Sequence, residues 1–319
     1  MLYQLSYTPA ARQAAPLSKP GAQGNARIHP ARRRAPFAGA APALAVFWAP
    51  DMHAPPSPPP IPVETLLLAY RSGIFPMADK REDCGIFWVE PRERAILPLD
   101  GLHLSKSLRR VIKSDRFQIT VNQSFEAVIR ACAAPRPGHP ETWISERIVQ
   151  SYLALHRVGH AHSVECWLTD AAGEWELVGG LYGVSFDRVF CGESMFSRAD
   201  NASKVSLAWL VAILRRAGYV LLDCQFMTEH LRSMGAAELP QADYLKAVHG
   251  ARGSPLVSLG TAWRGFMAGV SGLQSVAGAS GAAGVAVRAG VGAAAGEGLA
   301  AGFAASPGKA IVQSLTQTS

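Results

Sequence analysis

Residues 189–225 decide the fold, and they read VFCGESMFSRADNASKVSLAWLVAILRRAGYVLLDCQ. The run 189–195 is apolar and of strand length, whereas residues 202–217 repeat apolar positions at helical spacing. Gly218 stands where helices commonly end, and residues 219–225 are a second short apolar run. A strand, a helix and a strand in this order predict a crossover that brings two parallel strands together.

Polar side chains follow the ends of both predicted strands. Because successive strand residues face opposite sides, Asp223 and Gln225 share one face. Glu193 lies near the end of the other strand. Open sheets bind ligands beyond the carboxyl ends of parallel strands, so these three residues are candidates for a catalytic site. A strand that simply runs out into solvent gives the same pattern, and both interpretations stay open at this point.

The elements around this unit predict a mixed α+β fold. Further helices are expected at residues 62–72, 124–133, 145–158, 228–234 and 240–248, and further strands at 86–89, 95–97, 117–121, 162–168 and 176–185. Gly179, Gly180 and Gly183 lie inside one of these strands. Glycines in a strand indicate a bulge or a close approach of backbone to a neighbour.

The two ends of the chain differ in composition from the middle. Residues 1–60 are rich in Ala, Pro and Arg, and residues 251–319 are dominated by Gly, Ala, Ser and Val. We expect both to be disordered low-complexity segments. The apolar stretch after Arg32 resembles a signal peptide, but prolines interrupt it. Met52 is a candidate translation start just before the predicted folded part.

The net charge gives a local clue to partners. The chain carries a formal net charge of +7, yet residues 61–250 hold 21 Lys/Arg against 22 Asp/Glu. A nucleic-acid site on the folded part must therefore be a local patch. Four cations share one helix face by their i, i+3, i+4 and i+7 spacing, namely Lys106, Arg109, Arg110 and Lys113. Such a face binds phosphates, but it is equally typical of a solvated helix.

No metal or cofactor is predicted. A zinc-like set, His156, His160, His162 and Cys166, spans a helix end, a turn and a strand, so its side chains need not converge. The five cysteines include no CxxC pair, which favours a reducing compartment over a disulfide framework. Neither a Walker A loop nor GxGxxG occurs. Arg288 and Glu297 interrupt the apolar C-terminal segment, so we expect no membrane span.

Seven stretches between residues 61 and 250 are distinctive, namely LLLAYRSGIFPM (66–77), RPGHPETWIS (136–145), GHAHSVECW (159–167), LVGGLYGVSF (177–186), FCGESMFSRADNASK (190–204), LLDCQFMTEHLRSMGA (221–236) and LPQADYLKAV (239–248). Together they resemble leucyl/phenylalanyl-tRNA–protein transferases. The combination of GESMFSR with DCQ about 20 residues after it is the most specific part. One stretch departs from the family, because FWVEPRERAILP (87–98) stands where the family reads close to WWSPDPRAVLP.

The resemblance implies a fold and an activity. It implies a small N-terminal α+β domain, expected at residues 61–121, and an acetyltransferase-like (GNAT-like) domain at residues 122–250. The donor would be Leu- or Phe-tRNA, and the acceptor a protein whose N-terminal Arg or Lys becomes a degradation signal. The matching catalytic positions are Glu193, Asp223 and Gln225. A cytoplasmic monomer without a cofactor is expected.

The residues support this chemistry. An aminoacyl ester is already activated, and the acceptor α-amine, whose usual pKa is about 7.7–8.0, is partly neutral at pH 7. Glu193 and Asp223 suit proton acceptance or pairing with the acceptor's cation, with the assignment open, and Gln225 suits orientation of the reactants. A donor pocket, admitting Leu, Phe and Met, is expected from Leu181, Tyr182, Met195 and Phe196. Trp88 or Trp143 suits stacking on the terminal adenine or, equally, a place in the core.

Two other functions fit parts of the pattern. An acetyl-CoA-dependent N-acyltransferase would need a glycine-rich pyrophosphate loop before the helix 202–217, whereas residues 198–202 read RADNA. A non-catalytic RNA-binding module would need only the basic stripe and aromatic residues. It would give no reason to place Glu193, Asp223 and Gln225 together.

Overall fold

The computed structural model describes residues 58–135, 141–274 and 306–317. Its helices are α1 (Val63–Arg71), α2 (Lys106–Lys113), α3 (Phe125–Ala133), α4 (Glu146–Arg157), α5 (Ala202–Ala217), α6 (Glu229–Ser233), α7 (Gln241–Gly250), α8 (Leu259–Gln274) and α9 (Pro307–Thr316). Its strands are β1 (Phe75–Met77), β2 (Phe87–Val89), β3 (Glu93–Ile96), β4 (Gln118–Val121), β5 (Ala161–Thr169), β6 (Trp175–Phe186), β7 (Val189–Ser197), β8 (Leu221–Gln225) and β9 (Ala237–Pro240). The Met52 start and nearly all of the N-terminal extension lie outside the described residues.

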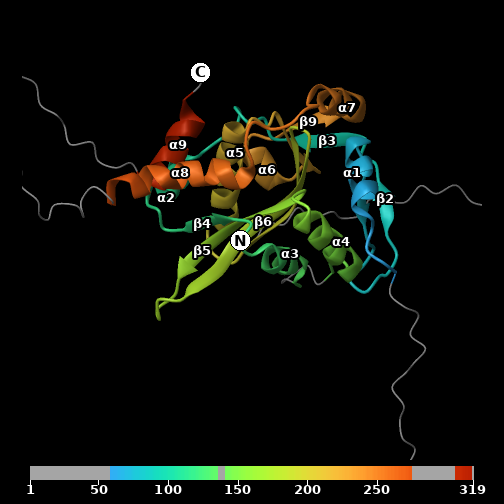
Figure 1. Cartoon of the computed structure of the whole chain (residues 1–319), viewed down its shortest axis with the longest axis horizontal. Helices are drawn as coiled ribbons and strands as arrows, with labels where there is room; N and C mark the ends of the chain where they lie inside the picture. The colour runs from blue at the N-terminus through green and yellow to red at the C-terminus, as the bar shows by residue number, and fades with distance from the viewer. Residues whose placement is uncertain (1–57, 136–140, 275–305, 318–319) are drawn as a thin grey trace, which may run out of the picture. The chain divides into compact units, whose positions relative to one another are not determined.

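One mixed sheet organises the described residues (Figure 1). Seven strands follow the order β4-β5-β6-β7-β8-β3-β9, and a separate two-stranded sheet pairs β1 with β2. Neighbouring strands are antiparallel except β7 and β8, which run parallel and are joined by α5. This pair is the crossover predicted from residues 189–225. Strand β3, which precedes the rest of the sheet in sequence, lies between β8 and β9.

Helices cover both faces of the sheet and pack against it through their apolar side chains. Helices α2, α5, α8 and α9 contribute to one core cluster, which contains Leu108, Leu210, Phe266 and Ile311. Helices α1, α3, α4 and α7 contribute to the other, which contains Leu66, Ile129, Tyr152 and Tyr244. Each cluster removes a continuous apolar surface from water, which is the main favourable contribution to folding.

Close packing of α5 on β6 depends on a strand glycine. A Cβ on Gly179 would lie 2.6 Å from the Cβ of Ala202, the first residue of α5. Only glycine allows this approach, which confirms the close backbone contact expected from the strand glycines. The helix is buried almost all round, from Ala202 to Ala217. The crossover is therefore fixed between the sheet and the outer helices.

Most predicted elements are confirmed, and so is the mixed α+β class with a large sheet in the C-terminal part. The domain limits differ from the expectation. Strand β4 ends at Val121 and pairs with β5 in the same sheet, so residues 121 and 122 mark no structural boundary. Strands β1, of three residues, and β9, of four residues, were not predicted.

The expected disorder of residues 251–319 is wrong for two segments. Residues 251–274 contain α8, and residues 306–317 contain α9. Leu259, Ala262 and Phe266 are buried, with Trp263 partly buried beside them, at helical spacing. The composition of the whole segment is dominated by Gly and Ala, so it did not indicate this apolar stripe. A few large side chains at helical spacing are nevertheless enough for a helix to pack on an existing core.

Candidate active site

The parallel strands β7 and β8 separate near their carboxyl ends. Their pairing ends with Cys191 opposite Asp223. Two residues further along β8, Gln225 has φ 62°. Non-glycine residues rarely adopt this left-handed backbone, and such strained positions cluster at functional sites. The opening between the strands is the place where ligands bind in sheets with parallel strands.

A β-bulge at Glu193 bends β7 at the same level. In the β6–β7 ladder, Tyr182 pairs with Ser194 while Gly183 pairs with Gly192, so Glu193 has no position opposite it. A bulge re-aims side chains relative to simple alternation. Here it directs the Glu193 carboxylate toward tyrosines of α1 and α4. The sequence alone did not predict this bulge at position 193.

The Glu193 carboxylate is buried and held by two tyrosines. The Tyr70 hydroxyl lies 2.7 Å from Oε1, the Tyr152 hydroxyl lies 3.1 Å from Oε2, and the two hydroxyls also lie within hydrogen-bond distance of each other. Because each hydroxyl carries one proton, these three contacts share two donors. Burial raises the pKa of Glu193 to about 7, although the tyrosine hydrogen bonds lower it; the Asp223 charge adds to the rise. Burial and then the Glu193 charge raise the pKa of both tyrosines, so their hydroxyls stay protonated.

Asp223 is fully buried and uses both carboxylate oxygens. Oδ1 accepts from the Arg94 Nε at 3.3 Å and from the backbone N–H of Gln225 at 2.8 Å. Oδ2 accepts from Arg94 Nη2 and from the Tyr244 hydroxyl at 3.0 Å. This carboxylate therefore joins β3, β8 and α7 and fixes the backbone of Gln225.

Arg94 lies between two aromatic rings. Its guanidinium carbon is 5.0 Å from the centre of the Phe75 ring and 4.4 Å from that of Tyr244, and its Nη1 donates to the Gly73 carbonyl at 3.3 Å. Burial, the largest single influence, lowers the pKa of Arg94, but the charge and hydrogen bond of Asp223 together with the Tyr244 and Cys191 side chains outweigh it, and the net shift is upward. Buried charges persist when they are paired and hydrogen bonded in this way.

The side-chain amide of Gln225 has a hydrogen-bond donor available for a ligand. Its side chain lies close enough to Glu193 to lower the pKa of that carboxylate. Its Nε2 is buried, yet makes no protein hydrogen bond of normal geometry. An unpartnered buried donor costs free energy, which a ligand acceptor would recover. The sequence-predicted trio therefore does come together.

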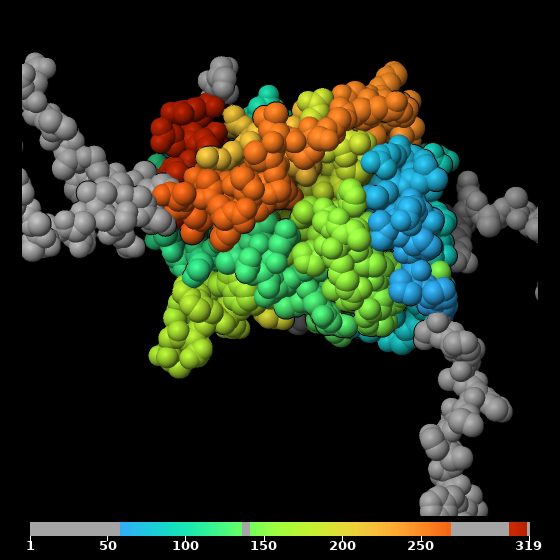
Figure 2. Space-filling view, viewed as in Figure 1, coloured from blue at the N-terminus to red at the C-terminus, as the bar shows by residue number. Residues whose placement is uncertain are grey.

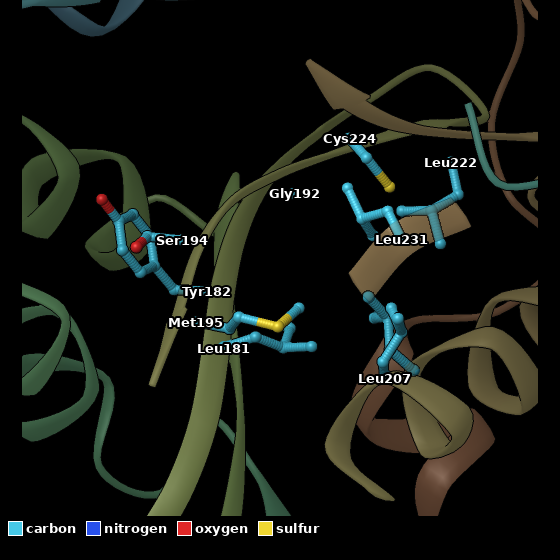
Figure 3. A pocket seen from close by; sticks show the side chains of 10 residues that line it. Leu181, Tyr182, Gly192, Ser194, Met195, Leu207, Leu222, Cys224 and Leu231 are labelled. Carbon is cyan, nitrogen blue, oxygen red and sulfur yellow. The ribbon is translucent and has the colours of Figure 1, made fainter. Parts of the chain in front are cut away.

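An apolar pocket opens beside the trio, on the opposite side of β7. In this structure its cavity volume is about 20 Å³, which is room for about one water molecule, so its walls must move apart to admit an amino-acid side chain. Its walls come from β6, β7, β8, α5 and α6 (Figure 3), and include Leu181, Tyr182, Gly192, Ser194, Met195, Leu207, Leu210, Leu222, Cys224 and Leu231. Figure 3 shows the leucine and methionine side chains pointing toward one another, and the Tyr182 and Ser194 hydroxyls pointing the other way.

The pocket includes three of the four residues expected in it. Leu181, Tyr182 and Met195 line it, whereas Phe196 is buried in the cluster on the other face of the sheet. The expectation for Phe196 followed from sequence proximity to Met195. Alternation along β7 places these two side chains on opposite faces instead.

The two candidate adenine-stacking tryptophans lie on neighbouring segments. Trp88 is 39% exposed and pairs with Pro76 across the β1–β2 hairpin. The Trp143 carbonyl accepts from the N–H of Ala78, just beyond β1, at 3.2 Å. Trp143 itself packs partly against the core cluster that contains Tyr152. Trp143 thus borders the same face of the sheet as the Glu193 carboxylate, and Trp88 lies on the hairpin that Ala78 connects to it.

The basic stripe forms as predicted. Lys106, Arg109, Arg110 and Lys113 are exposed on α2, while Leu108 and Ile112 are buried beneath them. Ser105 caps the helix by accepting from the N–H of Leu108 at 3.2 Å. Among these four cations, Arg109 is anchored, since its Nε donates to the Leu104 carbonyl at 2.9 Å.

The histidine and cysteine clusters do not form a reactive site. His156, His160 and His162 each use a ring nitrogen for a hydrogen bond within the protein. Within the described residues, no group of three His, Cys, Asp or Glu side chains is placed to hold a metal ion. Burial raises the pKa of the Cys191 and Cys224 thiols, which supports their interpretation as structural residues.

The sequence analysis missed four residues of this site: Arg94, Tyr70, Tyr152 and Tyr244. Arg94 offered a signal, because it directly precedes the apolar run Ala95-Ile96-Leu97. The three tyrosines lie on the buried faces of their helices, where a hydroxyl needs a partner. No local pattern says which partner that is.

Comparison with known proteins now identifies the family. The family model "Leucyl/phenylalanyl-tRNA protein transferase" matches residues 96–249, and the model of its N-terminal domain matches residues 60–92. A leucyl/phenylalanyl-tRNA–protein transferase of Novosphingobium aromaticivorans is 64% identical over 189 residues, which cover 59% of this chain and 70% of the relative. The relative from Chlorobaculum tepidum is 51% identical over 61% of this chain and 98% of its own length.

The chain belongs to the leucyl/phenylalanyl-tRNA–protein transferase family. The predicted enzyme class, an aminoacyltransferase that uses tRNA and protein substrates, is thereby confirmed. Among solved structures, a crystal structure of FemX is similar at 10% identity with a TM-score of 0.39, over 56% of this chain and 66% of that one. In the part of the chain that the structure describes, no helix is long and apolar enough to cross a membrane.

Proposed function

We propose that this transferase moves Leu or Phe, and also Met, from aminoacyl-tRNA to the N-terminal Arg or Lys of acceptor proteins. The supporting observation is that the Glu193 carboxylate and the Gln225 amide lie together where β7 and β8 separate, with an apolar pocket on the opposite side of β7. The acceptor preference and the resulting N-degron rest on the family resemblance. We further propose that the protein acts as a monomer in the cytoplasm, where aminoacyl-tRNA is made.

The apolar pocket suits the side chain of the donor amino acid. Its walls of Leu181, Met195, Leu207 and Leu222 offer no charge, so an aliphatic or aromatic side chain gains free energy on burial there. Pockets of this kind discriminate by only about 1–3 kcal/mol per methylene. Leu, Phe and Met are therefore all acceptable donors, whereas charged side chains are excluded by their desolvation cost.

The surroundings of the two carboxylates divide their roles. Asp223 accepts four hydrogen bonds from Arg94, Tyr244 and the Gln225 backbone, so it has little capacity left for a substrate proton. We assign it as a positioning residue for Gln225. Glu193 contacts neutral groups, namely the hydroxyls of Tyr70 and Tyr152 and the Gln225 amide, and its pKa of about 7 matches a general base near neutral pH.

The transfer then proceeds with atoms and charges balanced. The neutral α-amine attacks the ester carbonyl, forming a C–N bond and a tetrahedral intermediate. Glu193 accepts a proton from the attacking nitrogen, and the Gln225 Nε2–H donates to the carbonyl oxygen as negative charge develops. The C–O ester bond breaks, and the proton passes from Glu193 to the leaving ribose hydroxyl. The products are a new peptide bond and free tRNA.

The remaining contacts would hold the tRNA itself. The four exposed cations of α2 suit phosphate oxygens, which position RNA without reading its sequence. Trp88 or Trp143, on the Glu193 side of the sheet, suits the terminal adenine. Reaction at a free 3′ end needs no base-specific contacts elsewhere.

The acetyl-CoA alternative is disfavoured by the start of α5. The Ser197 Oγ accepts from the Ser203 N–H at 3.2 Å, and Asn201 has φ 69°. Gly179 packs directly against Ala202. A pyrophosphate would have to displace both the serine cap and the strand. A purely RNA-binding module, for its part, would not need the buried Arg94–Asp223 pair beside an apolar pocket.

A transfer assay tests the proposal. Labelled Leu-tRNA is incubated with a peptide that begins with Arg and with matched peptides that begin with Asp or carry an acetylated N-terminus. The proposal expects Leu to appear on the Arg peptide alone. Transfer to all three, or none with Leu-tRNA but acylation with acetyl-CoA, would overturn it.

A further inference from the structure

The C-terminal helices α8 and α9 lie beyond the part of the chain that matches the family models, which ends at residue 249. They are nevertheless joined to the core. Phe266 of α8 and Ile311, Val312 and Leu315 of α9 are buried in the cluster that includes Leu108 and Ile112 of α2. Figure 2 shows α8 and α9, in orange and red, at the surface of this side of the molecule.

The contact between α9 and α2 is intimate. The Gly308 N–H donates to the Asp115 carboxylate at 2.7 Å, just after the end of α2. A Cβ on Gly308 would overlap the Ile112 carbonyl oxygen and lie 2.7 Å from Asp115 Oδ1. Ser306 caps α9 by accepting from the Lys309 N–H at 3.3 Å. A glycine is thus required where the first turn of α9 meets the last turn of α2.

Helix α2 needs such support. It has only eight residues, and helices shorter than about 12 residues are marginal in water without tertiary packing. Its four exposed cations repel one another, and Leu108 and Ile112 are its only fully buried residues. Asp115, which receives the Gly308 bond, has φ 49°, an uncommon backbone for a non-glycine residue.

We propose that α9 is a positioning element for tRNA binding: by packing against α2 it holds the four cations of α2 in a fixed array. This inference rests on the proposed role of α2 as the tRNA contact. Preorganised cations bind phosphates better than mobile ones, because less conformational entropy is lost on binding. The chemistry between β7 and β8 uses none of the residues of α9.

The test compares Gly308→Val with Gln313→Ala, an exposed position of the same helix. Gly308→Val is expected to raise the KM for Leu-tRNA several-fold with kcat unchanged, and to reduce the salt slope of binding by about 1 or more. Hydrogen exchange of residues 104–114 should become faster in Gly308→Val only. With a short aminoacylated CCA oligonucleotide in place of tRNA, both variants should match the parent.

Asp115→Gly gives a second variant without steric overlap, in case Gly308→Val does not fold. It removes the acceptor of the Gly308 bond and suits the positive φ. Unchanged KM and unchanged exchange in the variants that fold would overturn the inference. The double variant Arg109→Ala/Arg110→Ala distinguishes failure of the α2 proposal from failure of the α9 proposal. If this variant binds tRNA as well as the parent does, the proposed role of α2 is wrong. If it binds tRNA more weakly while Asp115→Gly does not, only the proposed role of α9 is wrong.

Discussion

Arg94 of β3 and Asp223 of β8 form a buried ion pair that ties the N-terminal part of the chain to the candidate active site. Both side chains are almost fully inaccessible, at 1% and 0% exposure. The same carboxylate holds the backbone N–H of Gln225. A contact between distant parts of the sequence thus sets the backbone position of Gln225, the residue that we propose faces the substrate.

Removal of Arg94 should be costly for stability. Arg94→Ala leaves Asp223 as a buried charge without its cation, which typically costs about 3–5 kcal/mol. We expect a decrease of this size in the free energy of unfolding, measured by denaturant titration. Arg130→Ala is the matched control, because Arg130 is about half exposed and bridges Glu126 and Glu146 on the surface. Its cost should be about 0–1 kcal/mol; equal costs for the two variants would refute a structural role for the buried pair.

Glu193 should control the pH dependence of transfer. Its pKa is raised from 4.5 to about 7, so below pH 7 it is protonated and cannot accept a proton. We expect kcat/KM to rise with pH through about 7, and the Glu193→Gln variant to be slow and to lose this limb. The residual rise would follow the acceptor amine alone. If the pH profile of kcat/KM for Glu193→Gln kept the same rise near pH 7 as the parent protein, a group other than Glu193 would be responsible for it.

The same raised pKa should affect stability with a defined sign. Between about pH 4.5 and 7 the unfolded chain releases the Glu193 proton while the native protein retains it. The free energy of unfolding should therefore fall as the pH rises through this window. In Glu193→Gln this contribution should vanish. Plots of the free energy of unfolding against pH for the parent and the variant should therefore differ most in slope between about pH 4.5 and 7. Parallel curves would contradict the shift.

Donor selection should respond to the volume of the pocket. Leu207 lines it from α5, so Leu207→Phe should reduce the use of Phe-tRNA more than that of Leu-tRNA, by roughly tenfold in the ratio of kcat/KM values. Leu214→Phe, a buried position of α5 that does not line this pocket, controls for overpacking. An equal loss with both donors in Leu207→Phe would place the donor side chain elsewhere.

The basic stripe should control tRNA affinity. Arg109→Ala with Arg110→Ala is expected to raise the KM for tRNA and to reduce the slope of log affinity against log salt by about 2, because two phosphate contacts are lost. Filter binding at several salt concentrations measures this slope. An unchanged slope would remove α2 from the tRNA site.

Much of this architecture follows from local sequence patterns. The crossover at residues 189–225 and the helices of the core are amphipathic or bounded by glycine, so periodicity alone predicts them. Strand parity also selects Asp223, because side-chain alternation is a property of any regular strand. The two parallel strands are confirmed as neighbours.

The rest depends on contacts that no local pattern contains. The bulge at Glu193 and the positive φ of Gln225 interrupt regular strands. The directions of these two side chains therefore cannot be predicted from strand alternation. Arg94 and Tyr70 reach the site from segments more than 100 residues before their partners. Helix α9 was missed because its docking surface on α2 exists only in the folded protein.

The transfer rate of Gln225→Ala tests the central claim most directly. The Gln225 Nε2 makes no protein hydrogen bond of normal geometry, so its loss should leave the midpoint of thermal unfolding and the affinity for Leu-tRNA nearly unchanged. Single-turnover transfer to an Arg-starting peptide should nevertheless fall by about 100-fold or more, as for other donors to a developing oxyanion. Transfer at the parental rate by this folded, tRNA-binding variant would contradict the assignment of the reaction to the opening between β7 and β8.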